Sequence, residues 1–369
     1  MILVNEPLLD GNEKRYVNEC IDTSWISSEG PFVRRFENEM SKFVGRKYAS
    51  ACSSGTAALE LAVAALDLRE GDEVIMPSLT IISCAQALTN RKVKPVLVDS
   101  HPHTFNMNPE DIEGKITTKT RAIMVVHIFG LTVDVDPILK LAKRYNLKVI
   151  EDAAQMIGQT YKGKQCGSFG DLSIFSFYPN KHITTGEGGM VLCNDKKMDE
   201  RIKGYRNLCF GKDRFIHHEI GSNYRMTNLQ AALGVAQLEK IYKTVEKKRY
   251  IGKTYNALLK NLTQQVNLPI VSTTYCTNIY WVYSIVIKDE CKKSAKGVME
   301  NLREYGVETR PFFYPIHKQP VFNEMQLFLN ENLPVSENLY KKGFYIPSGL
   351  ALTEKQIIEV SEAMHKVFS

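Results

Sequence analysis

The sequence predicts an α/β fold in which a mostly parallel sheet is covered by helices on both faces. Short apolar runs have the length of buried strands and lie at residues 73–77, 95–99, 122–129 and 148–152. Segments with helical character alternate with these runs, at residues 55–68 and 136–146. Strands that alternate with helices are typical of a parallel sheet enclosed by two helical layers.

The C-terminal third of the chain has a different pattern. A long polar helical pattern begins near Thr227, and the alternation at residues 280–287 favours an antiparallel strand. Further helical patterns follow at residues 294–305 and 354–368. We therefore predict two domains, a large one over residues 1–250, which includes the N-terminal segment, and a smaller α+β one over residues 251–369.

Composition and charge narrow the class of protein. The 369 residues are 44% hydrophobic, which is enough to bury a large core. The net charge of +6 comes from mixed charges without a strongly basic region, so we expect no nucleic-acid partner, although a small anionic substrate would suit it. The N-terminus is unlike a signal peptide, and no apolar stretch has the length of a membrane span. We expect a cytoplasmic protein with no membrane partner.

The eight cysteines are scattered along the chain, and none form a CxxC pair. Zinc fingers and thioredoxin-like redox chemistry are therefore not expected, and we predict no metal site. Unpaired spacing in a chain of this length is typical of free thiols in a reducing compartment.

The first segment with chemical character is ASACSSGTAALEL, in which a strand ends and a helix begins. Small residues let the backbone approach a ligand closely, and a helix N-terminus offers free N–H groups to an anion. Ser54, Gly55 and Thr56 are therefore candidates for binding a phosphate. Considered alone, the segment is better explained by an ordinary serine N-cap.

The second segment is KVIEDAAQ, in which an apolar strand ends at Asp152 and Gln155 follows three residues later. Open α/β sheets bind ligands at the carboxyl ends of their strands. A carboxylate there can be a catalytic group, a metal ligand or the partner of a cofactor cation. The structural alternative is a helix N-cap after the strand.

The third segment covers residues 171–195, where the alternation in LSIFSF indicates a strand that carries Ser176. Lys181 follows on a turn, and a glycine-rich stretch and another strand come next. A lysine among apolar and small residues can lose its solvent, which lowers its pKa and makes it a usable Schiff-base nucleophile. The alternative is a surface lysine in a hairpin loop.

Together the three segments supply what a protein contributes to pyridoxal phosphate (PLP) chemistry. They offer a lysine that can form an imine, an acid that can pair with a pyridinium nitrogen, and a phosphate-binding turn. The order SSGTAAL, EDAAQ, FSFYPNK and TTGEGG, followed by GSNYRMTNLQAALG and TRPFFYPIH, closely resembles the sugar aminotransferases of the DegT/StrS family. The resemblance runs from about Trp25 to the C-terminus.

This resemblance implies the fold-type I aminotransferase architecture, with a mixed seven-stranded sheet in the large domain and a smaller C-terminal domain beside it. By the same resemblance, Lys181 would bind the cofactor covalently and move protons, and Asp152 would pair with the pyridine nitrogen. Gln155 would lie near the phenolic oxygen. The phosphate would be held by Ser54, Gly55, Thr56 and Ser176, and by Asn223 of the neighbouring subunit in a homodimer.

One position departs from the family pattern. Many relatives stack an aromatic residue on the cofactor ring from a PTFTF-like segment, where this sequence reads PSLTIIS, with Ile81. An aliphatic side chain can still pack on the ring but loses the aromatic part of the stacking, about 0.5–1.5 kcal/mol. We therefore assign Ile81 no role.

The implied activity is transfer of an amino group from L-glutamate to the 4-keto group of a nucleotide-linked 4-keto-6-deoxy sugar. Relatives with histidine in place of Lys181 dehydrate the sugar instead, so the lysine favours transamination. The WISSEGP and TRPFFYPIH segments look most like those of relatives that use GDP-4-keto-6-deoxymannose, with UDP- or dTDP-linked sugars as the alternative. Substrate contacts are expected from Trp25, Ser27, Arg310, Tyr314 and His317.

Alternatives exist for the residues and for the protein class. Trp25 could be a core residue, and Arg310 could form a structural ion pair. A regulatory protein with a vestigial PLP site is disfavoured because Lys181, Asp152 and Gln155 occur together. A Rossmann-type dehydrogenase is disfavoured because no GxGxxG follows the first strand of the sheet, and TTGEGG precedes a strand.

Overall fold

A computed structural model describes residues 1–213 and 215–369 of the chain. Within them the larger sheet has seven strands, of which five successive ones are parallel. In sheet order they are β1 (Tyr48–Cys52), β9 (Gly189–Cys193), β8 (Leu172–Ser176), β5 (Lys148–Asp152), β4 (Thr120–Val126), β2 (Glu73–Pro77) and β3 (Lys94–Val98). Strand β9 is antiparallel to both of its neighbours. The predicted mostly parallel, seven-stranded sheet is confirmed.

The register of this sheet brings the three motif segments together. Asp152 ends β5 and pairs with Ile174 of β8. Two residues further along β8, Ser176 pairs with Gly189 of β9, which also pairs with Cys52 at the end of β1. The segments that follow β1, β5 and β8 therefore begin at one edge of the sheet, where open α/β folds bind their ligands.

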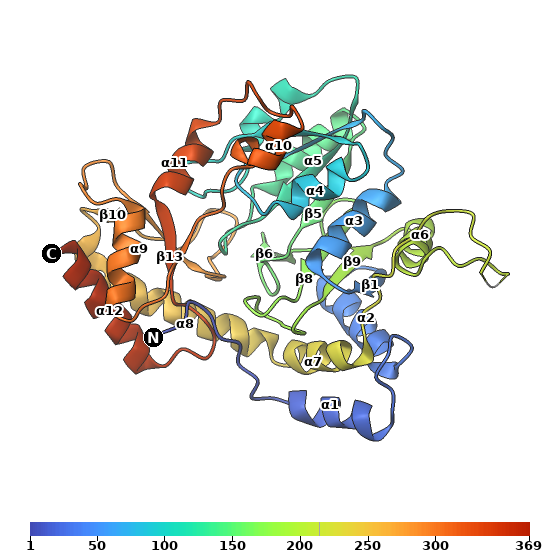
Figure 1. The fold of residues 1–369 in the computed structure, drawn as a ribbon, viewed down its shortest axis with the longest axis horizontal. Helices are drawn as coiled ribbons and strands as arrows, with labels where there is room; N and C mark the ends of the chain where they lie inside the picture. The colour runs from blue at the N-terminus through green and yellow to red at the C-terminus, as the bar shows by residue number, and fades with distance from the viewer. Residues whose placement is uncertain (214) are drawn as a thin grey trace.

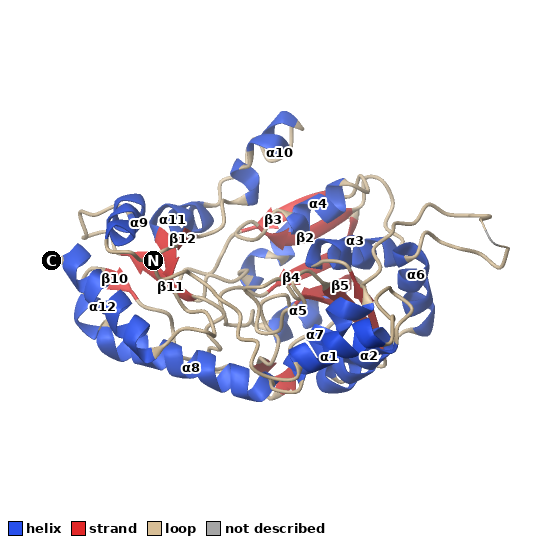
Figure 2. Cartoon of the chain, turned by 60° about the horizontal axis from the view of Figure 1, so that its bottom comes forward, coloured by secondary structure: helices blue, strands red, loops and turns tan. Residues whose placement is uncertain are grey.

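Helices cover both faces of the sheet, as Figure 2 shows. Alternate strand residues face opposite layers, so that Met124 of β4 packs in the core beneath α3 and α4, whereas Ile123 packs in the core beneath α5. On the first face lie α3 (Gly55–Ala65), α4 (Ser83–Thr89) and α6 (Lys196–Arg206). On the other lie α1 (Glu13–Asp22), α2 (Pro31–Val44), α5 (Val135–Arg144) and α7 (Asn228–Leu238). Within the described residues, no helix combines the length and apolar character needed to cross a membrane.

The C-terminal part forms a second, antiparallel sheet with its own core, at the left of Figure 1. Its strands are β10 (Val266–Asn267), β11 (Tyr283–Ile287), β13 (Gly343–Ile346) and β12 (Arg310–Pro311), and its helices are α8 (Ile241–Leu258), α9 (Ala295–Glu304) and α12 (Glu354–Phe368). Ile2 pairs with Val307, so the first residues of the chain join this part. Shorter elements are α10 (Pro320–Glu324), α11 (Pro334–Lys342), β6 (Thr160–Tyr161), β7 (Lys164–Gln165) and 3-10 turns at Pro109–Asp111, Glu113–Lys115, Lys260–Leu262 and Ile316–Lys318.

The long helical pattern that begins near Thr227 proves to be two helices, α7 and α8. Thr227 caps α7 through a reciprocal pair of hydrogen bonds with Gln230. At Lys240 the backbone N–H bonds to the carbonyl three residues back, and the side chains of Glu239 and Lys240 bind groups in the N-terminal segment. These distant contacts interrupt a pattern that is continuous in the sequence. The predicted domain boundary after residue 250 falls inside α8 and stays a prediction.

Candidate active site

A cavity of about 370 Å³ opens at the carboxyl ends of the parallel strands. Seven of the eight residues predicted to bind the cofactor line it: Ser54, Gly55, Thr56, Asp152, Gln155, Ser176 and Lys181. The register of β1, β5 and β8 thus brings together residues that are up to 127 positions apart in the sequence. The arrangement fits the rule that α/β sheets bind ligands at this edge.

The first turn of α3 forms the anion-binding end of the cavity. Ser54 is the N-cap, and its Oγ accepts a hydrogen bond from the Ala57 N–H at 3.1 Å. A Cβ atom on Gly55 would lie 2.7 Å from Cβ of Ser176, so only glycine allows this turn to approach β8 so closely. The free N–H groups of the turn and the positive end of the helix dipole therefore face the same space as the Ser176 side chain.

Asp152 is a buried carboxylate at the end of β5. One oxygen accepts a hydrogen bond from the Ala154 N–H at 2.9 Å, and the other accepts one from the Cys84 thiol at 3.4 Å. Burial raises the pKa of Asp152, although these two hydrogen bonds and the positive charge of Lys181 oppose the rise. A cation beside this carboxylate would stabilise its ionised form.

Lys181 lies on the loop after β8, and its side chain lines the cavity. Burial lowers the pKa of Lys181 to about 8, and the nearby Asp152 carboxylate opposes that change. More of this amine is therefore neutral near pH 7.5 than for an exposed lysine, and the neutral amine is the nucleophile. The expectation of a desolvated lysine agrees with this environment.

The chain resembles known aminotransferases over almost its whole length. Residues 7–365 match the DegT/DnrJ/EryC1/StrS aminotransferase family. The chain belongs to this family.

Relatives and solved structures agree with this assignment. GDP-perosamine synthases of Caulobacter vibrioides and Escherichia coli O157:H7 are 41% and 42% identical to this aminotransferase. The matches cover 99% of this chain and 98% of the first relative, and 100% and 99% for the second. The structure of Helicobacter pylori PseC, an aminotransferase involved in the biosynthesis of pseudoaminic acid, matches with a TM-score of 0.93 at 26% identity, over 100% of this chain and 99% of that one. The predicted fold-type I architecture is thereby confirmed.

The family uses pyridoxal phosphate, and the cavity of this aminotransferase fits that group. A solved neighbour, ntda of Bacillus subtilis, contains bound PMP and matches with a TM-score of 0.87 at 27% identity, over 97% of this chain and 81% of that one. In the present chain, an anion site at α3, a buried carboxylate that favours a cation and a desolvated lysine share one cavity. These are the three groups that the phosphate, ring nitrogen and aldehyde of the cofactor require.

Gln155 and Ile81 are two further residues of the cavity wall that the sequence analysis considered. The Gln155 Oε1 atom accepts a hydrogen bond from the Phe129 N–H at 2.7 Å, which fixes the amide against the cavity. Ile81 also lines the cavity and is 44% exposed. An aliphatic side chain thus lines the cavity at this position, and its packing on the cofactor ring stays a prediction.

Several lining residues were missed by the sequence reasoning. They include Tyr178, Asn180, Glu187, Trp281, Phe313 and Tyr345. Trp281 lies in the YWVYSIVI run, which the alternation marked only as a strand. No local sequence pattern could indicate that Trp281 lies beside Lys181, because only tertiary packing brings Trp281 to the lysine loop.

The remaining predicted residues lie outside the cavity of this chain. Asn223 is exposed and pairs with Asn207 through the backbone. Trp25 is half-exposed, so the alternative that it belongs to the core is wrong, and the carbonyl of Ser27 accepts a hydrogen bond from the Asn228 N–H. Their proposed contacts, with a partner's phosphate for Asn223 and with substrate for Trp25 and Ser27, stay predictions.

The three predicted substrate residues of the C-terminal part have structural partners. Arg310 forms an ion pair with Glu308 at 2.9 Å, and the Tyr314 ring packs against Tyr340. His317 is buried, with its Nδ1 atom 2.7 Å from the Ser78 hydroxyl and its Nε2 atom 3.0 Å from a Glu337 oxygen. The ion-pair alternative for Arg310 therefore agrees with the structure, and no residue of this group lines the cavity in the described part of the chain.

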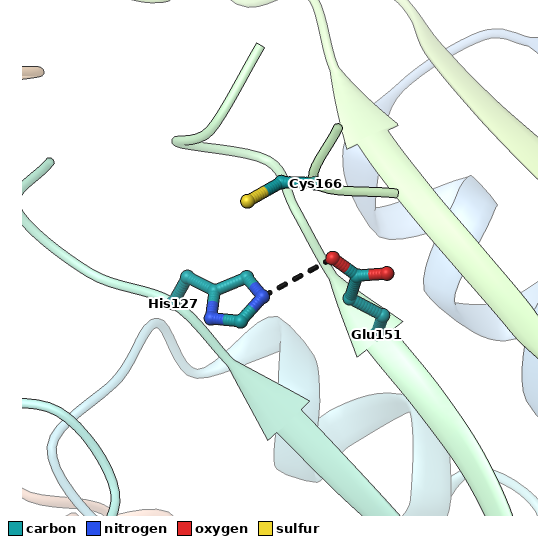
Figure 3. A group of neighbouring side chains, drawn as sticks. All are labelled: His127, Glu151 and Cys166. Atoms are coloured by element: carbon teal, nitrogen blue, oxygen red, sulfur yellow. Dashed lines mark hydrogen bonds and ion pairs between the residues drawn. The ribbon is translucent and has the colours of Figure 1, made fainter. Parts of the chain in front are cut away.

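A buried group of His127, Glu151 and Cys166, drawn in Figure 3, has the composition of a metal site. Two of its three members, however, already bond to backbone N–H groups. The His127 Nδ1 atom accepts the Val133 N–H at 3.0 Å, which puts the ring proton on Nε2, facing Glu151 at 3.2 Å. Both Glu151 oxygens accept further backbone N–H groups, at 2.6 and 2.8 Å. His127 and Glu151 therefore form a hydrogen-bonded pair that joins the ends of β4 and β5.

Proposed function

We propose that this aminotransferase moves the amino group of L-glutamate to the 4-keto group of GDP-4-keto-6-deoxymannose and so makes GDP-perosamine. The observation that carries the proposal is the full-length similarity to GDP-perosamine synthases, with three such relatives at 38–42% identity. A relative that acts on a dTDP-linked 3-amino sugar is 34% identical and covers a smaller share of the chain. The alternative substrates are UDP- and dTDP-linked 4-keto sugars.

The proposed roles follow from the positions of the side chains. Pyridoxal phosphate, when bound, carries the amino group and acts as an electron sink. Lys181 would hold the cofactor covalently, and the first turn of α3 with Ser176 would hold its phosphate. Asp152 would stabilise a protonated ring nitrogen, which the burial of the carboxylate supports because an ionised Asp152 needs a nearby cation. Gln155 would lie beside the ring.

Lys181 would also move the proton during transfer. When it is free of the cofactor, its amine can take a proton from one carbon atom and return it to another as general base and acid. A pKa of about 8 suits both directions, because the amine changes protonation state close to neutral pH. A lysine with an ordinary pKa would remain protonated and could not act as a base.

The test of the substrate is a competition experiment. The enzyme, loaded with PLP, is given L-glutamate and equal amounts of GDP-, UDP- and dTDP-4-keto-6-deoxy sugars, and the amino products are separated by mass. We expect the GDP-linked product to form fastest. Faster turnover of a UDP- or dTDP-linked sugar would contradict the proposed substrate, and a Lys181→Ala sample controls for non-enzymatic amination.

We further propose a homodimer in which Asn223 serves the partner's phosphate site. Asn223 is exposed and lies in a polar stretch just before α7, outside the cavity of its own chain. An Asn223→Asp change would put a negative charge against the phosphate, so it should damage the partner's site. This variant would be mixed with Lys181→Ala, and a mass tag on one of the two variants would report the exchange of subunits. The resulting heterodimers should have one intact site and more activity than either variant alone. Heterodimers without that gain would contradict the shared site.

A further inference from the structure

Trp281 is a buried side chain that joins the C-terminal part of the chain to the lysine loop. It lies two residues before β11, is 3% exposed, and lines the cavity. Its indole Nε1–H donates a hydrogen bond to the carbonyl of Asn180 at 2.9 Å, across 101 positions of sequence. Its ring lies nearly parallel to Phe129, with 6.4 Å between centroids and 9° between planes. The indole is thus held in one orientation.

The fixed ring faces the amine of Lys181. The Nζ atom of Lys181 lies 4.2 Å from the centroid of the indole, well within the range of a cation–π interaction. Asn180, which the indole binds through Nε1, is the residue before Lys181. One side chain therefore holds the backbone that carries the lysine and also contacts its charged end.

We propose that the Trp281 indole holds the free, protonated Lys181 amine in the part of the reaction cycle in which the lysine is detached from the cofactor. Trp281 is then a positioning residue that acts through Lys181, and the inference rests on the proposed role of that lysine. A detached lysine has a flexible four-carbon stem, and a ring face at its tip confines the amine to the cavity. A neutral ring attracts the ammonium less strongly than a carboxylate would, so the amine remains able to leave.

Other groups also act on the charge of Lys181 and must be separated from the indole. The Asp152 carboxylate and the Cys84 thiol favour the ammonium, whereas burial and the neighbouring His182 disfavour it. Glu187, Tyr178 and Tyr345 line the same cavity. The test therefore has to change the electrons of the indole ring while leaving these groups and the packing in place.

Fluorinated tryptophan provides that change. Fluorine withdraws electron density from the ring face and weakens its attraction for a cation, while the shape and the Nε1–H group are kept. The chain has only two tryptophans, and the other one, Trp25, is half-exposed. Apoenzyme with mono-, di- and trifluorinated tryptophan would be trace-acetylated between pH 6 and 11. The labelling of the Lys181 peptide, measured by mass, then gives the pKa of Lys181, with exposed Lys253 as the internal reference.

We expect the pKa of Lys181 to fall stepwise with fluorination. Trp281→Leu should lower it by about half to one unit, whereas Trp281→Phe, which keeps a ring, should restore most of the difference. Phe344→Leu is the matched control, since it removes a buried aromatic ring that does not line the cavity and should leave the pKa of Lys181 unchanged. A pKa that stays constant or rises in the fluorinated series overturns the inference, even if Trp281→Leu fails to fold. Borohydride trapping of PLP on wild-type Lys181 is measured separately, because its failure would reject the proposed function and not the indole contact.

Discussion

The loop after β8 and the helix α8 each place a lysine against Trp281, and the two lysines differ in burial and in what they contact. Burial lowers the pKa of Lys181 to about 8 and that of Lys248 to about 7. The Lys248 amine donates hydrogen bonds to the backbone carbonyls of Trp281 and Ser348, at 2.9 and 2.5 Å. The Lys181 amine instead faces the indole and the cavity.

The two lysines show that a pKa lowered by burial does not by itself make a lysine a nucleophile. A lowered pKa alone would mark Lys248 as the better nucleophile, because its pKa is the lower of the two. The Lys248 amine, however, donates to two backbone carbonyls. These hydrogen bonds hold the segment before β11 and the loop after β13 together. What distinguishes Lys181 is an amine that opens onto a cavity shared with Asp152 and the first turn of α3.

The largest expected effect comes from removing the lysine that faces the cavity. Lys181→Ala should reduce turnover about 1,000-fold or more, because it removes both the proposed attachment point of the cofactor and the proposed proton-transfer group. The measurement is formation of the amino-sugar product per folded molecule. Lys248→Met, assayed beside it, should lose less than tenfold. Equal losses in the two variants would remove the distinction between the lysines.

Asp152→Asn should have the next largest effect, a loss of about 100-fold or more in turnover. An amide cannot balance a positive ring nitrogen as the buried carboxylate would, whereas the hydrogen bond from Ala154 can be kept. Steady-state rates at saturating PLP would measure the loss, with circular dichroism to show that the fold is intact. Near-normal turnover would assign the role to another acid.

Lys248→Met should act on stability. It leaves the carbonyls of Trp281 and Ser348 without their buried donor, so we expect the free energy of unfolding to fall by about 1–3 kcal/mol. Denaturant unfolding monitored by fluorescence measures the change. Lys253→Met, which changes an exposed lysine on the same helix, is the matched control. A Lys248 variant as stable as this control would show that the two hydrogen bonds contribute nothing.

A further effect, on the pH dependence of stability, tests the burial of a histidine whose hydrogen bond to the Ile157 carbonyl does not offset the loss of solvent. His182 follows Lys181, and burial lowers its pKa to about 3, while its Nε2 atom has no partner among the described residues. Between pH 3 and 6.5 the unfolded histidine binds a proton that the folded one does not, so stability rises with pH across this window. Relative to His182→Gln, the wild type should lose up to about 1.4 kcal/mol for each unit of acidification. His103→Gln, at an exposed site, should keep the wild-type slope; an equal slope in His182→Gln would contradict the assignment.

The sequence predicted the sheet and the cofactor side of the cavity because their signals are local. A parallel strand that ends in a functional residue, as at Asp152 and Ser176, carries both its fold and its chemistry in a short segment. Trp281 and Lys248 could not be recognised, because their partners lie 33 to 101 positions away and only packing brings them together. The break between α7 and α8 was hidden for the same reason. The role proposed for Asn223 involves a partner subunit, so it could not be derived from the fold of one chain.

We propose that Lys181, and not the more deeply buried Lys248, carries the cofactor. Reduction of the PLP-loaded enzyme with borohydride would fix a pyridoxyl group to the lysine that holds it, and digestion followed by mass spectrometry would identify the modified peptide. The account predicts one pyridoxyl group, on the peptide that contains Lys181. A pyridoxyl group on Lys248 or on any other lysine would contradict it.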